Sequence, residues 1–468
     1  MERIKTNVED IERSIYDIRD TDHKSYQVSK GLTEDIVREI SSGKNEPDWM
    51  LELRLKSLKQ FQEMDMPAWG PSLHELDMDQ IITYVRPDAN MSDDWKELPD
   101  DIRGTFDRLG IQKAEQDALA GVGAQYDSEV VYHSIKEHLN KQGVIYTDMD
   151  TAVQEHEEIV KKHFMKLLSS KEHKFLALHG AVWSGGSFVY VPAGVEVDMP
   201  LQSYFRLNAP GAGQFEHTLI ICEPGSKLHF IEGCSAPRYN VLNLHAGGVE
   251  LYVQDGASLR YSTIENWSKN MLNLNTKRAK VGKDGTIEWV SGTFGSHITM
   301  LYPMSILSGE NARSEYTGVS FANEGQFLDT GTKVVHGAPN TSSTISSKSI
   351  SKNGGNASYR SAVVIQPNAK NSKCSVVCES LMLDHESRSD TIPVMDVRND
   401  TADIGHEAKI GRISEESIFY LMSRGLNEEE AKALIVRGFV EPVTKELPME
   451  YAVEMNRLIG LELEGTIG

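Results

Sequence analysis

Thiol, imidazole and carboxylate side chains lie close together in the stretch 374–407. Cys374 and Cys378 are two of the four cysteines in the chain, and the stretch ends near the adjacent residues His406 and Glu407. Thiolate and imidazole suit a soft or borderline metal such as iron, and a carboxylate adds negative charge. The alternative is structural, because a cysteine in a strand is commonly a small buried apolar residue and a His-Glu pair commonly lies on a solvated corner. These residue types alone leave both interpretations open.

The spacing of the two cysteines argues against a closed zinc site. The residues from Val376 to Leu383 are mostly β-branched or apolar and predict a strand. Four residues of strand extend about 13 Å, so the two thiols would share a face without meeting. Two sulfurs on one tetrahedral metal lie within about 4 Å of each other, because each metal–sulfur bond is about 2.3 Å long. A metal at Cys378 would therefore take its other ligands from elsewhere, as in an open or transient site.

Length and composition describe a soluble globular protein. The chain has 468 residues, 39% hydrophobic and 25% charged, which allows about three domains. The formal net charge of -21 disfavours nucleic acids and anionic membranes as partners, because both are negatively charged. The N-terminal residues lack the apolar core of a signal peptide, and no later run is long and apolar enough to span a bilayer. Four cysteines in such a chain indicate reduced cytoplasmic thiols rather than a disulfide framework.

A helical period dominates residues 1–172, which we interpret as an N-terminal helical domain. Apolar residues recur every three or four positions from Leu51 to Phe61 and predict one buried stripe on a helix that Pro67 ends. Further helices are predicted at 128–143 and near 157–168, with loops and short helices between about 70 and 125.

Near residue 173 the period changes to two, and residues 173–404 form a series of short β-rich segments separated by turns of small residues. The turn residues recur in steps of 31, 31, 29, 26, 29 and 28 residues: Gly194, Gly225, Gly256, Gly285, Asn311, Asn340 and Asn368. Glycine and asparagine tolerate a positive φ, and such a step is typical of a β-solenoid. The lack of predicted helices between the strands excludes Rossmann and TIM-barrel arrangements. A β-sandwich stays open, although the regular step favours a parallel β-helix.

The helical period returns in residues 405–468, which we interpret as a C-terminal helical domain. Ser414 is a candidate N-cap, and Asn427 with Glu430 forms a capping-box pattern for a helix that ends at Gly438. Helices at the end of a solenoid can cap its open edge or dock a partner, and the sequence leaves both open.

Ordered motifs along essentially the whole chain resemble the SufB/SufD family of the SUF iron-sulfur cluster assembly machinery, and within it the SufB scaffold subunits. They are QFEHTLIICEPGSKLHFIEGCSAP from Gln214, ENW from Glu265, DTGTKVVHGAPNTSSTISSKSIS from Asp329, GHEA from Gly405 and LPMEYAVEMNRLI from Leu447. The fold of that family is a parallel β-helix between N-terminal and C-terminal helical domains. It agrees with the architecture inferred from the residues.

The resemblance implies a route for sulfur. Persulfide sulfur would enter at Cys234, in the EGCSAP motif, and pass through the β-helix interior to Cys378. Polar residues on that route would correspond to Arg206, Asn208, Glu265, Trp267 and Lys277. Transfer needs a thiolate, and Arg206 and Lys277 could lower a thiol pKa or hold an anionic sulfur. The alternative for these residues is ordinary ion pairing and packing. Glu265 stands where the best-known members carry glutamine.

The resemblance also implies partners and a cargo. Cys378, Glu407 and His406 would hold a transient iron-sulfur cluster at the interface with SufD or with a second SufB. The C-terminal helices would dock SufC, an ATPase of the ABC type, and this chain has no G-x-x-x-x-G-K-[ST] loop of its own. A cysteine desulfurase, with or without a sulfur carrier, would supply sulfur, apo-proteins would receive the cluster, and a reduced flavin in the complex is allowed. The chain would thus be a cytoplasmic scaffold and not an enzyme.

Two alternatives belong to other classes. A β-helix enzyme acting on polysaccharide would need secretion, and the GHEA and EGCSAP motifs argue against it. A SufD-type structural partner would have no cluster chemistry of its own, and the presence of Cys378 together with Glu407 argues against that. Cys222 and Cys374 fall where family cysteines are not expected. Both are interpreted as buried thiols, with Cys374 as a spare sulfur carrier if the strand bends.

Overall fold

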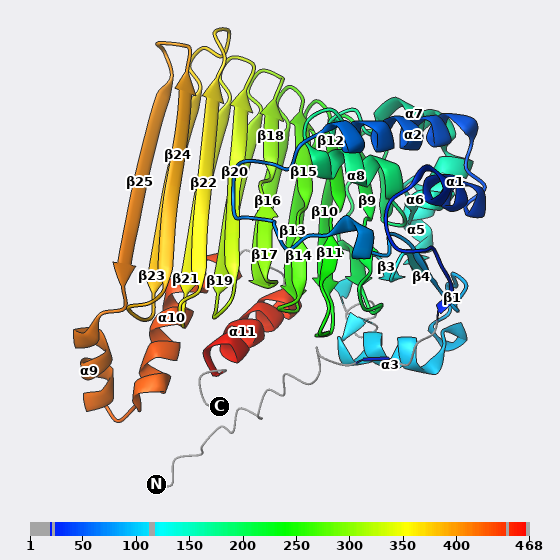
Figure 1. The fold of residues 1–468 in the computed structure, drawn as a ribbon. Coiled ribbons are helices and arrows are strands. Elements are labelled where there is room, and N and C mark those ends of the chain that lie inside the picture. The colour runs from blue at the N-terminus through cyan, green and yellow to red at the C-terminus, as the bar shows by residue number, and fades with distance from the viewer. Residues whose placement is uncertain (1–18, 21–23, 112–117, 446–448, 465–468) are drawn as a thin grey trace.

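The computed structural model describes residues 19–20, 24–111, 118–445 and 449–464. Its core is a parallel β-solenoid in which two long sheets face each other, with helices near both ends of the chain (Figure 1). Strands of successive turns pair in parallel, which distinguishes the core from a β-sandwich. The prediction of a mainly β chain with a parallel β-helix core and flanking helices is therefore confirmed.

The first sheet has ten strands. They are β3 (Gly121–Tyr126), β4 (Glu129–Ile135), β7 (Leu201–Arg206), β10 (Lys227–Ser235), β13 (Ser258–Trp267), β16 (Thr286–Gly295), β19 (Arg313–Ala322), β21 (Ser342–Ser351), β23 (Lys373–Met382) and β25 (Asp403–Arg412). Strands β4 and β25 form its two edges. Because β3 and β4 precede residue 172 and β25 extends past residue 404, the solenoid reaches into both segments that we predicted to be helical. The division into three domains at those positions stays a prediction.

The facing sheet changes its form along the solenoid. In the early turns it consists of two parallel rows, and in the later turns of one row of longer strands. The first row is β5 (Ile145–Asp148), β6 (Ser187–Val191), β9 (His217–Cys222), β12 (Gly248–Val253), β15 (Thr276–Val281) and β18 (Met304–Leu307), and the second is β8 (Gly213–Gln214), β11 (Asn243–His245), β14 (Met271–Asn273) and β17 (Ile298–Leu301). Both rows pair with β20 (Phe327–His336), which β22 (Asn356–Ile365) and β24 (Arg388–Val397) follow. Early turns therefore contain three strands and later turns two.

Turn residues stack on one another along the solenoid, as the repeat predicted. In this row of turns, the residues with positive φ are Gly194, Gly225, Gly256, Asp284, Asn311, Asn340 and Asn371. Each of the first six donates its N–H to a carbonyl in the next turn, at 2.7 to 3.1 Å. The predictions of Gly285 and Asn368 are wrong by one and three residues, because aspartate and asparagine also tolerate the left-handed region and these turns offer more than one candidate.

The helix predicted from the apolar residues near Leu51 is α2 (Asp48–Glu63), which lies beside α1 (Glu34–Gly43) and α8 (Lys174–Val182). Its buried face is not purely apolar. Arg54 is fully buried there, because it pairs with Glu46 at 2.5 Å and donates to the carbonyl oxygen of Trp183 at 2.9 Å. Such pairing is what makes a buried guanidinium tolerable.

The predicted helix at 128–143 is wrong in its first half. Residues 129–135 form β4, which pairs antiparallel with β3, and only the short α5 (Glu137–Lys141) is helical. Sheet pairing overrides the local period here, helped by the β-branched pair Val130 and Val131. The remaining N-terminal elements are β1 (Lys24–Gln27), β2 (Val85–Pro87), α3 (Asp100–Arg108), α6 (Met149–Glu155), α7 (Glu157–His163) and two short 3₁₀ helices (Met78–Gln80 and Trp95–Glu97).

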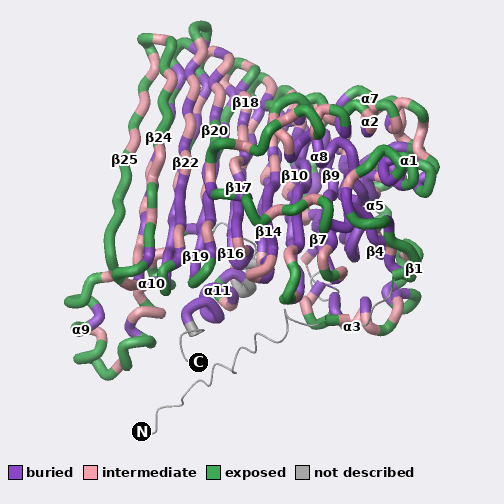
Figure 2. The backbone as a smooth tube through the Cα atoms, in the orientation of Figure 1, coloured by how far each residue is buried: buried purple, intermediate pink, exposed green. Residues whose placement is uncertain are grey.

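The C-terminal helices leave the last strand of the solenoid uncovered. Ser414 caps α9 (Glu415–Ser423), and Asn427 with Glu430 forms the predicted capping box of α10 (Glu428–Thr444), which continues past Gly438. Helix α10 and α11 (Met449–Glu464) pack on the outer face of the ten-stranded sheet instead of on its edge (Figure 1). Strands β24 and β25 are largely exposed (Figure 2). Across the described part of the chain, no helix combines the length and the apolar character needed to cross a bilayer.

Candidate functional site

The two cysteines of the predicted sulfur route face into the solenoid. Cys234 lies on β10 and Cys378 on β23, in the same sheet, and both thiols are buried. Glu232 on β10 contacts Lys277 of the facing sheet, so Cys234, two residues later, also points inward. Five steps between neighbouring strands separate β10 from β23, which corresponds to about 24 Å. Neither thiol lies on an outer wall.

Strand register connects the two cysteines through two adjacent rows of small polar residues. The row that leads from Glu232 to Cys378 contains Thr263, Ser291, Gly318 and Ser347. The row that begins at Cys234 contains Glu265, Thr293, Ser320, Ser349 and Ser380. Within the described residues, the buried hydroxyls of Tyr359, Ser361 and Thr391 on the facing sheet have no hydrogen-bond partner. The interior between the two thiols is therefore suited to a small polar guest.

A buried charge cluster surrounds Cys234. The Lys277 ammonium donates to Glu232 at 2.7 Å and to Thr263 Oγ1 at 3.1 Å, and it lies 3.5 Å from the Glu265 carboxylate. The amide of Asn273 donates to Glu265 at 2.7 Å. Of the sequence-predicted residues, Glu265 and Lys277 therefore belong to one cluster. We did not predict Glu232 from the sequence. Its position two residues before Cys234 on a strand places both side chains on the same face, and this signal could have identified it.

Trp267 lies at the far end of the same cluster. Its ring packs against the His245 ring, with the two centroids 4.5 Å apart. Burial by itself lowers the pKa of His245, but Glu216, Glu265 and Asn273 together outweigh burial and raise the pKa above its ordinary value. His245 also hydrogen-bonds Asn273 at 2.8 Å, and Asn273 in turn reaches Glu265. The cluster is thus a continuous chain of ion pairs and hydrogen bonds.

Both thiols of the route favour the protonated form in this chain. Burial raises the pKa of Cys234 well above its ordinary value, and the Glu232 and Glu265 carboxylates raise it further, against a smaller opposing effect of Lys277. Burial raises the pKa of Cys378 to about 12. Lys277 lowers the pKa of Cys234, in the direction that the sequence suggested, but burial and the carboxylates have the larger effect.

Arg206 and Asn208 lie apart from this cluster. The Arg206 guanidinium donates to the hydroxyl of Ser235 at 2.9 Å, and Ser235 follows Cys234 directly, so it faces the other side of the sheet. The N–H of Asn208 donates to Asp127 at 2.6 Å, and Asn208 lines a pocket of about 210 Å³ on that side. The structure therefore groups Glu265, Trp267 and Lys277 around the interior thiol but places Arg206 and Asn208 behind it.

Cys378 and His406 meet at the other end of the solenoid. Cys378 Sγ lies 3.7 Å from His406 Nε2, across the pairing of β23 with β25. Glu407 follows His406 directly and points to the outer face, where its carboxylate is 3.0 Å from the Lys409 ammonium and its side chain is 59% exposed. The structure brings the thiol and the imidazole together and leaves the carboxylate outside. No three His, Cys, Asp or Glu side chains among the described residues gather closely enough to hold a metal ion.

The other two cysteines, Cys374 and Cys222, are also buried thiols. Cys374 shares the inward face of β23 with Cys378 and lies opposite Ser343 and Ile404 in register. Cys222, at the end of β9, packs in the apolar interior. Burial raises the pKa of both thiols, to about 12 for Cys222.

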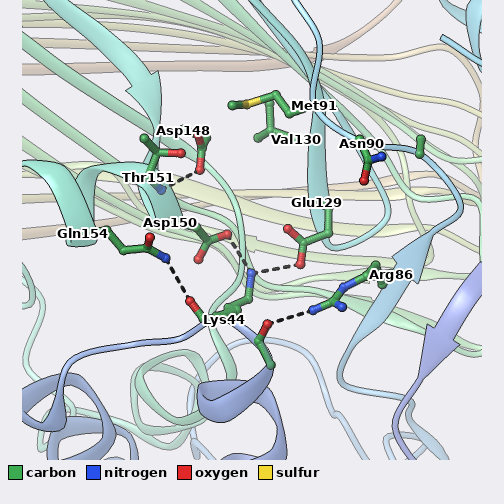
Figure 3. Close-up of a pocket in the computed structure, with 12 residues that line it drawn as sticks. Lys44, Arg86, Asn90, Met91, Glu129, Val130, Asp148, Asp150, Thr151 and Gln154 are labelled. Atoms are coloured by element: carbon green, nitrogen blue, oxygen red, sulfur yellow. Dashed lines mark hydrogen bonds and ion pairs between the residues drawn. The ribbon is translucent and has the colours of Figure 1, made fainter. Parts of the chain in front are cut away.

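One pocket lies beside helix α6 and strand β4 and contains none of these thiols. It has a volume of about 340 Å³ and adjoins β4, at the opposite edge of the ten-stranded sheet from β25. Figure 3 shows Lys44 between two carboxylates, with its ammonium 3.0 Å from Glu129 and 2.7 Å from Asp150. The lining residues of this pocket include no cysteine or histidine. It is therefore not part of the candidate site.

Comparison with known proteins agrees with the geometry. A family model described as "SUF system FeS cluster assembly, SufBD core domain" matches residues 205–439, and one described as "SufBD protein N-terminal region" matches residues 42–203. The chain is 53% identical over 453 residues to iron-sulfur cluster assembly SufBD family proteins of Staphylococcus aureus strains MRSA252 and USA300 and of Staphylococcus saprophyticus, with 97% of each chain covered. This protein therefore belongs to the SufBD family of iron-sulfur cluster assembly proteins.

Proposed function

We propose that this chain is a SufB-type scaffold on which an iron-sulfur cluster is assembled. The observation that carries the proposal is the distance of 3.7 Å between Cys378 Sγ and His406 Nε2, one strand from the uncovered edge β25. Thiolate and imidazole both ligate iron, and Cys378 must lose its proton to do so. Two donors from one chain leave positions for sulfide and for residues of a second subunit across the edge.

The second subunit in this proposal is a SufD or another copy of this chain. Among the described strands β25 pairs with β23 alone, and Val394, Val397 and Ile410 on the last two strands are exposed. An unpaired strand edge with apolar side chains beside it favours association with another sheet. Glu407, which points outward, would then act across the interface.

Sulfur supply in this proposal runs from Cys234 to Cys378. The two interior rows of serine and threonine support it, because hydroxyl groups can hydrogen-bond a polar guest along the way. A cysteine desulfurase, with or without a carrier, would load Cys234 with persulfide sulfur. Apo-proteins would receive the finished cluster. A reduced flavin in the complex and a cytoplasmic location stay predictions.

A SufC-type ATPase of the ABC class would dock on the C-terminal helices. Phe419, Tyr420 and Met422 of α9 and Leu434 of α10 are exposed apolar side chains on neighbouring helices. Aromatic residues and methionine are enriched in protein interfaces. The chain itself would then be a scaffold and not an enzyme, with ATP hydrolysis carried out by the partner.

Anaerobic reconstitution with iron and sulfide tests the scaffold function. The wild-type chain, alone or with its partner subunit, should develop the visible absorption of an iron-sulfur cluster. The Cys378→Ala variant should lose this absorption, whereas Cys374→Ala, four residues away on the same inward face, should keep it. An unchanged spectrum in Cys378→Ala would remove the proposal.

The alternative is a SufD-type partner without cluster chemistry. One observation favours it: burial raises the pKa of Cys378 to about 12, which disfavours the thiolate that iron requires. Copurification with the neighbouring subunits and mass measurement of the complex distinguishes the two. A complex in which a different SufBD chain carries all the cluster ligands would support the alternative.

A further inference from the structure

A row of alternating charges lies on the outer face of the sheet, directly behind Cys378. Lys348 on β21, Glu379 on β23 and Lys409 on β25 are opposite one another in strand register. Glu379 follows Cys378 directly, so the two side chains point to opposite faces of the same strand. The row therefore spans the strands that carry both members of the Cys378–His406 pair.

Two contacts tie this row to helix α10. The Lys348 ammonium forms an ion pair with the Glu379 carboxylate, and it also lies 4.4 Å from the centroid of the Phe439 ring. The Lys348 side chain is only 9% exposed, and the Glu379 side chain is 28% exposed. A cation removed from water in this way depends on its anion and on the ring face.

Glu379 also acts on the edge strand. The Lys409 ammonium is attracted first by Glu407 and, more weakly, by Glu379, and both carboxylates raise the pKa of Lys409. Strand β25 has no other neighbour than β23 among the described strands and is mostly exposed. The β23 ladder therefore holds this strand beside Cys378, and Lys409 lies opposite Glu379 in that ladder.

We propose that Phe439, Lys348 and Glu379 link α10 to the strand of Cys378, with Glu379 as a positioning residue that keeps His406 beside the thiol. Displacement of α10 would withdraw the Phe439 ring from Lys348, weaken the hold on Glu379 and loosen the Cys378–His406 pair. The regulatory meaning rests on the proposed docking of an ATPase at the C-terminal helices. The link itself needs neither iron nor a partner.

Alkylation of Cys378 by iodoacetamide in the full-length, metal-free chain, followed by peptide mass spectrometry, tests the link. Glu379→Gln should raise the alkylation rate of Cys378 severalfold, because Lys348 then lacks its ion-pair partner and the attraction between Glu379 and Lys409 of β25 is lost. Cys374, four residues away on the same strand, should keep its rate and serves as the internal reference. Glu379→Asp, which keeps the carboxylate, should restore most of the protection.

Arg260 and Glu288 supply a matched control pair. They are opposite each other on β13 and β16, on the same outer face, and the Arg260 guanidinium donates to Glu288 at 2.6 Å. Glu288→Gln removes the same kind of charge far from Cys378 and should leave its alkylation unchanged. Equal rates in Glu379→Gln and Glu288→Gln would overturn the positioning role.

Phe439→Leu tests the part played by the helix. Leucine keeps the apolar packing but removes the ring face from Lys348, so Cys378 should react faster than in the wild type and more slowly than in Glu379→Gln. Wild-type reactivity in Phe439→Leu would overturn the connection to α10. Because the measurement uses no iron, failed cluster reconstitution together with a positive alkylation result would reject the scaffold function and leave the link standing.

Discussion

The end of the solenoid around Cys234 buries charged side chains in its interior, whereas the end around Cys378 does not. Around Cys234 the turns have three strands and enclose Glu232, Glu265 and Lys277, all nearly inaccessible to water. Around Cys378 the turns have two strands, the interior contains mainly hydroxyl and apolar side chains, and the last strands are open to solvent. We call these the closed end and the open end.

The difference shows where each kind of chemistry can take place. A buried ion-pair cluster is stable only as a complete set, because removing one member leaves the others unpaired in a medium of low polarity. The open end pairs the Cys378 thiol with the His406 imidazole, and its edge can accept ligands from outside. The closed end is therefore suited to holding a thiol, and the open end to assembling a shared metal centre.

Breaking the buried cluster should produce the largest effect on stability. Lys277→Met leaves Glu232 and Glu265 as buried carboxylates without their cation, and we expect the free energy of unfolding to fall by about 3–5 kcal/mol. Urea unfolding measures this loss. Lys227→Met, which breaks the exposed pair with Glu196 on the surface, should cost about 0–1 kcal/mol. Equal losses in the two variants would contradict the contrast between a closed cluster and a surface pair.

Two buried histidines, His336 in the later turns and His245 in the closed end, should respond to pH with opposite signs. Burial lowers the pKa of His336, in the later turns, to about 4, below the ordinary value near 6.5. Its stabilising contribution is therefore present above pH 6.5 and is lost as the pH falls toward 4, by about 2 kcal/mol at pH 5. The pKa of His245, in the closed end, is raised, so its contribution is present below pH 6.5 and is lost as the pH rises through its folded value.

Urea unfolding between pH 5 and pH 8 measures these opposite signs. His336→Asn should flatten the loss of stability on the acid side, whereas His245→Gln should flatten the loss on the basic side. A common sign for both variants would contradict the opposite pKa directions of these two histidines.

A smaller effect should distinguish the inward from the outward face of one strand. Ser347 lies in the interior row that ends at Cys378, and Ser346, its neighbour on β21, points outward. Ser347→Val replaces the hydroxyl group by two methyl groups, which removes a hydrogen-bonding group from the row and narrows it, so sulfur supplied as persulfide should reach Cys378 severalfold more slowly. Ser346→Val should leave the rate unchanged. Mass spectrometry of the Cys378 peptide follows the added sulfur, and equal rates would remove the interior route.

Much of the solenoid was predictable because its signal is local and repeated. A turn residue that tolerates positive φ occurs about every thirty residues, and five of the seven predicted positions are confirmed. The pairing of Cys378 with His406 in one site was also expected from the sequence. The orientation of Arg206 could not be expected from the sequence. Its contact with Ser235 depends on the residue at which β7 ends and on the face of the sheet to which the Arg206 side chain points.

Local sequence is sufficient for the strand period, for the turns and for caps such as Ser414 and Asn427, because each depends on a residue and its near neighbours. Only the assembled sheets decide that residues 129–135 form a strand, that Glu232 meets Lys277, and that Glu407 points away from Cys378. These outcomes depend on register between strands far apart in the chain. A shift of one residue would turn every side chain of a strand to the other face, and no local pattern specifies it.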